Sequence, residues 1–252
     1  MILGLEFPPI SHVTEWPTFL GDGPLGVNKV ILFMWISVGL VFGLMYLAGR
    51  QQALVPRGIQ NVAESTVEFV QDNIILQTIG PSGLGFTPFL LTLFTFVLTC
   101  NIWGLVPGVQ MPVNARIALP MFMAVLVWVI YHTVGIMHQG PITYFKNIMF
   151  MPNVPKAMYI LLTPIELVTK LITQPLSLAV RLFANMLAGH LLLVSFAVIT
   201  QALLEATIIG AALPLALLIF LSGFELLVAL LQAYIFTILA AVYIGDAMHP
   251  AH

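Results

Sequence analysis

The stretch Thr163–His190, TPIELVTKLITQPLSLAVRLFANMLAGH, places polar side chains inside an otherwise apolar part of the chain. Arg181 lies in the middle of a hydrophobic run, and an arginine keeps its proton at any ordinary pH. A cation at bilayer depth costs about 3 kcal/mol or more, so a charge retained there indicates a function. The same stretch also contains Glu166, Lys170, Gln174, Ser177, Asn185 and His190.

The composition predicts an all-α polytopic membrane protein. The 252 residues are 60% hydrophobic and only 7% charged, whereas a soluble domain carries about 25% charged residues. The net charge of -2 and the lack of a basic cluster argue against a nucleic-acid partner. The single cysteine, Cys100, excludes a disulfide framework and a cysteine metal site, and we expect it to be a buried apolar residue. We expect no cofactor and no metal.

Apolar segments long enough to cross about 30 Å of hydrocarbon predict three roughly upright spans. Another segment has apolar residues at helical spacing and polar residues on its other side. It predicts an amphipathic helix, lying on the inner membrane surface or on a partner. The upright spans are residues 28–48, 86–106 and 117–137, and the amphipathic helix is 57–76.

The charged residues indicate an orientation. Residues 1–27 form an acidic arm without the basic region of a signal peptide. Arg50 and Arg57 follow the first span, so the positive-inside rule places that side in the cytoplasm and the arm outside. Counting crossings puts the polar, proline-rich connection 138–156 inside as well. Residues 247–252 then form a cytoplasmic tail.

Residues 157–200 and 206–246 are two apolar segments that are too long for upright spans. As helices each would be about 60 Å long, twice the thickness of the bilayer core. Either each helix is broken at a proline, or both lie steeply tilted. We favour two long, tilted helices that form an antiparallel hairpin and bend at their prolines. The candidate positions are Pro164, Pro175 and Pro214.

On a regular helix, which advances about 100° per residue, the polar residues of the first long segment share one face. The small residues Ala184 and Ala188 lie on the same face, so another helix can approach it closely. His190 falls on the opposite face. A histidine side chain titrates near physiological pH and can relay protons. The shared face comprises Thr163, Glu166, Lys170, Gln174, Ser177, Arg181 and Asn185.

The second long segment carries Glu225 and Gln232, seven residues apart on one face. In an antiparallel hairpin that turns near Glu205–Thr207, Arg181 lies level with Gln232. His190 then lies level with Glu225, and the two pairings agree to about 3 Å of rise. The hairpin therefore predicts a fixed cation beside an amide at one level, and a titratable histidine and carboxyl nearer the outside.

Three motifs resemble subunit a of F-type ATP synthases: NIWGLVPG at Asn101–Gly108, PLSLAVRLFANMLAGH at Pro175–His190, and the downstream LLQAYIFTILAAVY. The similarity extends from about Asn28 onward. It implies a membrane stator subunit that faces a rotating ring of c subunits and is held by b-type peripheral stalk subunits in the lipid bilayer. It also implies a proton-channel subunit that is not itself an enzyme, in a bacterial plasma membrane or, alternatively, a mitochondrial or thylakoid membrane.

The resemblance implies roles for single residues. Arg181 matches the arginine that faces the ring carboxylate, and Asn185 and Gln232 match the family's amides beside it. His190 and Glu225 stand where some members have Glu and His, a swapped pair. We hypothesise an outer half-channel lined by His190, Glu225 and Ser222. We place an inner one near Glu166, Lys170, Gln174 and Tyr243, with Ser177 on the Arg181 face.

Two other functions are compatible with the composition. A proton-coupled secondary transporter would need inverted repeats or broken helices around a midplane site, and the sequence shows no repeat. A haem-binding respiratory subunit would use His132, His138 and His190. The six-residue spacing of the first two histidines puts them on different helix faces.

Overall fold

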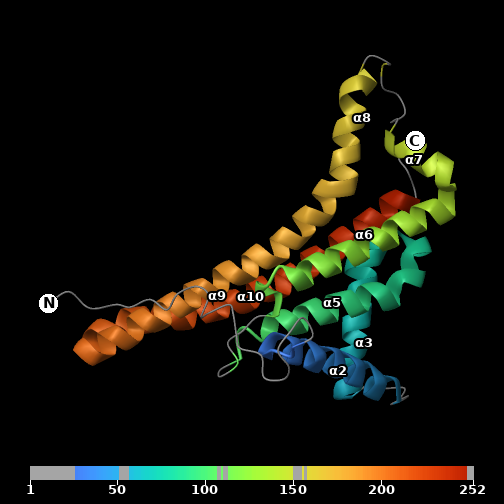
Figure 1. Cartoon of the computed structure of the whole chain (residues 1–252). Helices are drawn as coiled ribbons and strands as arrows, with labels where there is room; N and C mark the ends of the chain where they lie inside the picture. Colours follow the sequence, from blue (N-terminus) through green and yellow to red (C-terminus); the bar gives the residue numbers. More distant parts are fainter. Residues whose placement is uncertain are drawn as a thin grey trace. The chain divides into compact units, whose positions relative to one another are not determined.

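The computed structural model describes residues 26–50, 57–106, 109, 113–149, 155 and 158–248. Five helices in this part are long and apolar enough to span a membrane, so the all-α polytopic class is confirmed. The elements (Figure 1) are α2 (Lys29–Arg50), α3 (Ile59–Val70), η1 (Gln71–Ile75), α4 (Leu76–Thr78), η2 (Pro81–Phe86), α5 (Thr87–Ile102), η3 (Val113–Ala115), α6 (Ala118–Gln139), α7 (Pro141–Met149), α8 (Tyr159–Val168), η5 (Thr169–Thr173), α9 (Gln174–Ala206) and α10 (Ile208–Met248).

The chain divides into two compact units, each assembled from separate stretches of sequence. Unit one combines the chain up to Leu44 with Thr95–Arg116 and Phe183–Ala233. Unit two combines Met45–Phe94, Ile117–Leu182 and the chain from Tyr234 onward. The predicted arm 1–27 lies almost wholly outside the described residues, whereas the first two residues of the predicted tail 247–252 belong to α10. The predicted tilt of the long helices remains a prediction.

Buried polar contacts connect the helices of unit one. The Asn101 side chain on α5 is 2% exposed, donates to the Ala229 carbonyl of α10 and accepts from Asn114 in η3. The Trp103 indole donates to the Ser37 hydroxyl of α2 at 2.8 Å. Because an unpaired polar group in an apolar interior costs several kcal/mol, these bonds fix how α2, α5 and α10 pack. Cys100 is fully buried, as predicted.

The predicted turn of the hairpin is found at Thr207, the one residue between α9 and α10. Its N–H donates to the Leu203 carbonyl, and its own carbonyl accepts from Ala211. Within unit one α9 and α10 then run antiparallel, side by side (Figure 1). Ala211, Ala229 and Ala233 are buried on α10, and such small residues allow close helix packing.

The amphipathic helix α3 packs one face against its own chain, and its predicted position on the membrane surface or on a partner remains a prediction. Val70 and Ile74, in α3 and the π-helical turn η1, are fully buried. In unit two the Phe69 ring contacts Phe94 of α5 and Tyr234 of α10. Gln60, which the helical pattern placed on the polar side, is also buried and donates to Glu64.

Two connections differ from the sequence prediction. Helix α5 ends at Ile102, earlier than the predicted 106. Part of the predicted polar connection 138–156 is the helix α7. Gly140, with φ +81°, ends α6, and Pro141 begins α7. Glycine adopts positive φ freely and proline suits the first turn of a helix, so this Gly-Pro pair separates two helices.

A π-helical turn, η5, interrupts the first long helix between Val168 and Gln174. Its hydrogen bonds span five residues, so the helix face shifts by about one residue, or roughly 100°. The prediction that Thr163, Glu166 and Lys170 share the Arg181 face on a regular helix is therefore wrong. The physical cause is Pro175, which cannot donate a backbone hydrogen bond and crowds the preceding turn.

Glycine 135 sets the packing of α6 against α7, because a Cβ at this position would collide with the Tyr144 ring. Tyr144 is buried and packs edge-on against His132, so it cannot move aside. We expect Gly135→Ala to destabilise the protein by about 1–3 kcal/mol, measured by unfolding in detergent. Gly223→Ala is the control, since its Cβ meets open space. Equal stability of the two variants would contradict the packing.

Candidate functional site

The face of α9 around Arg181 is narrow and polar, and the described part of the chain leaves it largely uncovered. Arg181 is half-buried, while Ser177, Ala184, Asn185 and Ala188 are exposed. Ser177 and Asn185 lie one turn before and one turn after Arg181. A face with a permanent charge and small neighbours suits the close approach of another polar group.

Asn185 connects this face to α10. Its Nδ2 donates to the Gln232 Oε1 at 2.7 Å, and Gln232 is 2% exposed. The Gln232 Nε2 makes no further hydrogen bond among the described residues. The predicted level of Gln232 with Arg181 remains a prediction. The pair fixes the amide of α10 beside the uncovered face.

Glu225 lies against α9 at a glycine. A Cβ on Gly189 would come within 2.9 Å of the Glu225 Oε1, so the missing side chain is what admits the carboxyl. Glu225 is 6% exposed, and its Oε2 has no hydrogen-bond partner in the described part of the chain. A buried carboxylate of this kind is costly unless it is protonated, paired or hydrated.

His190 follows Gly189 and is also buried. No hydrogen bond or ion pair joins His190 to Glu225 within the described residues, so their pairing remains a prediction. Ser222, one turn before Glu225, donates to the Leu218 carbonyl of its own helix. Unit one therefore brings two buried titratable side chains to the same part of the hairpin.

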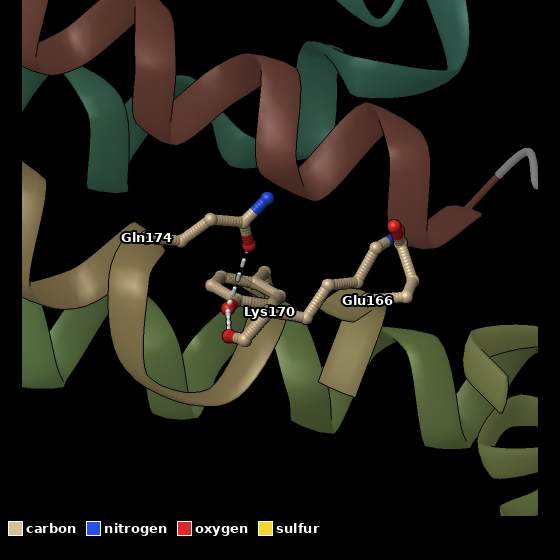
Figure 2. A network of polar contacts seen from close by, with 4 residues as sticks. Glu166, Lys170 and Gln174 are labelled. Carbon is tan, nitrogen blue, oxygen red and sulfur yellow. Dashed lines mark hydrogen bonds and ion pairs between the residues drawn. The ribbon is translucent and has the colours of Figure 1, made fainter. Parts of the chain in front are cut away.

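A second polar group lies in unit two, along α8, η5 and the start of α9. Figure 2 shows Glu166, Lys170 and Gln174 on successive turns. The Lys170 Nζ is 3.9 Å from the Glu166 carboxylate. The Tyr131 hydroxyl of α6 bonds to the Lys170 carbonyl at 2.9 Å and to the Gln174 Oε1 at 3.1 Å. Tyr131 is not among the site residues predicted from the sequence.

Tyr243 of α10 belongs to the same group. Its ring lies 5.7 Å from that of Tyr131. His132 is buried beside Tyr131, and its Nδ1 is 3.0 Å from the Trp128 carbonyl. The sequence feature that could have indicated Tyr131 is the polar, aromatic stretch 131–133 inside the apolar span 117–137. Such a stretch also occurs in membrane helices without a functional site.

Among the described residues, no group of three or more His, Cys, Asp or Glu side chains is arranged to hold a metal ion. What the fold and the site define is a helical, multi-pass membrane protein with an uncovered cationic face and buried titratable side chains. Intramembrane groups of this kind are typical of proteins that move ions or protons.

Comparison with known proteins identifies the family. Residues 31–245 match the family described as "ATP synthase A chain". ATP synthase subunit a of Frankia alni is 43% identical over 255 residues, covering 97% of this chain and 87% of the relative. The subunits a of a Parafrankia and a Methylobacterium species are 44% and 38% identical and cover 96% and 99% of this chain, and 83% and 100% of the relatives. The chain belongs to the ATP synthase subunit a family of the membrane (Fo) sector.

The Asn185–Gln232 hydrogen bond predicts energetic coupling. Replacing either residue by alanine leaves the other amide without its partner. The double variant should therefore lose less free energy of unfolding than the two single variants lose together. We expect a coupling energy of about 1 kcal/mol, measured by unfolding in mixed detergent micelles.

Ser222→Ala combined with Gln232→Ala is the control pair, because Ser222 bonds only within its own helix. The effects of that pair should add. Additive effects for Asn185 and Gln232 would show that their bond contributes nothing.

Proposed function

We propose that this chain is the proton-translocating stator of the ATP synthase Fo motor. In this proposal it offers two offset aqueous half-channels, and Arg181 faces the carboxylate of a rotating c-ring. The observation that carries the proposal is the uncovered face of α9, where Ser177, Ala184, Asn185 and Ala188 surround Arg181 and are exposed. A charge in an apolar helix that its own chain leaves uncovered needs a partner of opposite sign.

The mechanism follows from the cost of charge in lipid. A ring carboxylate crosses the lipid as the neutral acid, because the ionised form is too costly there. Beside Arg181 it ionises, since an opposite charge stabilises the anion. It releases its proton to one half-channel and takes another from the second. Each proton contributes about 2.3 kcal/mol per 100 mV of membrane potential.

Arg181 also separates the two half-channels. A guanidinium holds its proton at any physiological pH, so it cannot pass protons along. A continuous water path would dissipate the gradient without turning the ring. The Asn185–Gln232 bond at 2.7 Å is consistent with this role, because it joins α9 to α10 by a direct contact within unit one.

We assign the outer half-channel to His190, Glu225 and Ser222. Glu225 and His190 are buried and titratable, and the Glu225 carboxyl reaches α9 at Gly189. Proton transfer needs groups that exist in both protonation states, and a carboxyl without a fixed ion-pair partner meets this need. The swapped identities of these two positions in the family agree with one shared task.

We assign the inner half-channel to Glu166, Lys170, Gln174 and Tyr243. The support is the polar group in unit two, in which Lys170 approaches Glu166 and the Tyr243 ring lies beside Tyr131. Glu166, Lys170 and Gln174 lie on successive helical turns that precede Arg181 in the chain. The π turn at Thr169–Thr173 sets their direction.

The remaining parts of the proposal concern the complex. The chain itself carries out no nucleotide chemistry, which resides in the F1 sector, and its partners are the c-ring and b-type peripheral stalk subunits. Arg50 at the end of α2 and Arg57 after it favour a cytoplasmic C-terminus and an external N-terminus in a bacterial plasma membrane. Mitochondrial and thylakoid membranes remain the alternative.

A proton-coupled secondary transporter is the other candidate, since buried titratable groups in a helical membrane protein also serve transporters. Co-purification separates the two. The stator proposal requires a c-ring and stalk subunits to purify with this chain, whereas a transporter would purify alone and take up a substrate.

Arg181→Ala should abolish proton-driven ATP synthesis while the complex still assembles, because the ring carboxylate loses the charge that ionises it. Synthesis is measured in inverted vesicles, with the amount of assembled complex determined in parallel. Arg181→Lys is the matched control for charge, and we expect it to be inactive too, since an ammonium lacks the planar fork. Normal synthesis by Arg181→Ala would overturn the proposal.

Exchanging His190 and Glu225 for each other should preserve more proton-driven synthesis than changing either one to alanine. The exchange keeps one carboxyl and one imidazole in the same region, whereas each single change removes a proton-accepting group. The three variants are compared at equal levels of assembled complex. The same loss in all three would count against a shared task.

A further inference from the structure

The π turn η5 leaves one backbone carbonyl without its usual partner. In this turn the Gln174 N–H donates to the Thr169 carbonyl, five residues earlier. The next donor in the same register, for the Lys170 carbonyl, is residue 175, which is a proline and has no N–H. A carbonyl inside a membrane helix has to find a donor elsewhere.

The Tyr131 hydroxyl is that donor. It reaches across from α6 to the Lys170 carbonyl at 2.9 Å and to the Gln174 Oε1 at 3.1 Å, and the contact lies beside the side chains drawn in Figure 2. A phenol hydroxyl has one proton, so it donates to the two acceptors in alternation. Otherwise the Gln174 amide is flipped, and its NH₂ group donates to the Tyr131 oxygen. One hydroxyl thus stabilises the backbone of the turn and orients a side chain on it.

Tyr131 itself is held firmly. It is 4% exposed, and its ring lies 4.4 Å from His132 and 5.7 Å from Tyr243. The two residues it holds are polar groups that we assign to the inner half-channel. The π turn also sets the direction in which Lys170 points, since a regular helix would rotate the residues before the turn by about 100° relative to those after it.

We propose that Tyr131 is a positioning residue of the inner half-channel, which caps the Lys170 carbonyl and holds the Gln174 amide in the path of the proton. This inference rests on the proposed function above. It adds a residue of α6 to a path otherwise formed by the long hairpin.

The test uses Tyr131→Phe in the assembled ATP synthase, with proton-driven synthesis measured per assembled complex. Removing the hydroxyl should lower the rate roughly fivefold or more, because a buried hydrogen-bond network loses its centre. Tyr144→Phe is the matched control. It removes a hydroxyl from another buried tyrosine near the same histidine, and its rate should stay normal.

Two further variants separate positioning from a purely structural role. Pro175→Ala restores an N–H at residue 175, so in the Tyr131→Phe background it should restore thermal stability but not the rate. Gln174→Leu should lower the rate, and adding Tyr131→Phe should then cost little more, because Tyr131 acts through Gln174. Full recovery of the rate by Pro175→Ala, or additive losses with Gln174→Leu, would overturn the positioning role.

The outcome for Tyr131 is distinguishable from failure of the proposed function. A Tyr131→Phe complex that works normally, while Arg181→Ala is inactive, overturns the Tyr131 inference alone. An active Arg181→Ala complex overturns the stator function itself, and the Tyr131 inference falls with it.

Discussion

A guanidinium inside an apolar helix is the constraint on which the rest of this structure depends. Arg181 cannot shed its charge, and its own chain provides no ion pair for it among the described residues. The helix around it is built accordingly, with small or polar side chains at Ser177, Ala184 and Ala188 left uncovered. In the proposed function, a carboxylate from outside the chain offsets the cost of this charge.

The hairpin satisfies a second constraint, which is that polar groups at membrane depth need partners. The side-chain amides of Asn185 and Gln232 share one hydrogen bond. The Asn101 amide donates to the Ala229 carbonyl and accepts a hydrogen bond from Asn114. Glycine at position 189 gives the Glu225 carboxyl room against α9. Groups left without a full set of partners, such as Glu225, are those to which we assign proton transfer.

Much of this architecture was predictable because lipid leaves few choices. Apolar length and composition predicted the membrane helices, and the polar break before Thr207 predicted the turn of the hairpin. The π turn was not predictable from Pro175 alone, because a proline can also kink or end a helix. Which outcome occurs depends on whether a donor such as Tyr131 lies beside the freed carbonyl.

The candidate site was likewise predictable only in part. The motif around Arg181 predicted a charged face, and the hairpin predicted that Gln232 lies near it. The hydrogen bond between Asn185 and Gln232 could not be predicted, because the rotation of each helix about its own axis decides which side chains meet. The burial of Gln60 and the contact of Glu225 with Gly189 depend on which helices pack together. Helical spacing within one segment carries no information about that.

Disulfide cross-linking to the ring tests the central claim most directly. Cys100 is the only cysteine of the chain and is buried, so it contributes little background. Cysteines introduced at Ser177 or Ala184 should cross-link efficiently to a cysteine placed beside the ring carboxylate. A cysteine at Trp35, exposed on α2, should not. Absence of cross-links at both α9 positions, or an equal yield at Trp35, would contradict the assignment of this face to the rotor.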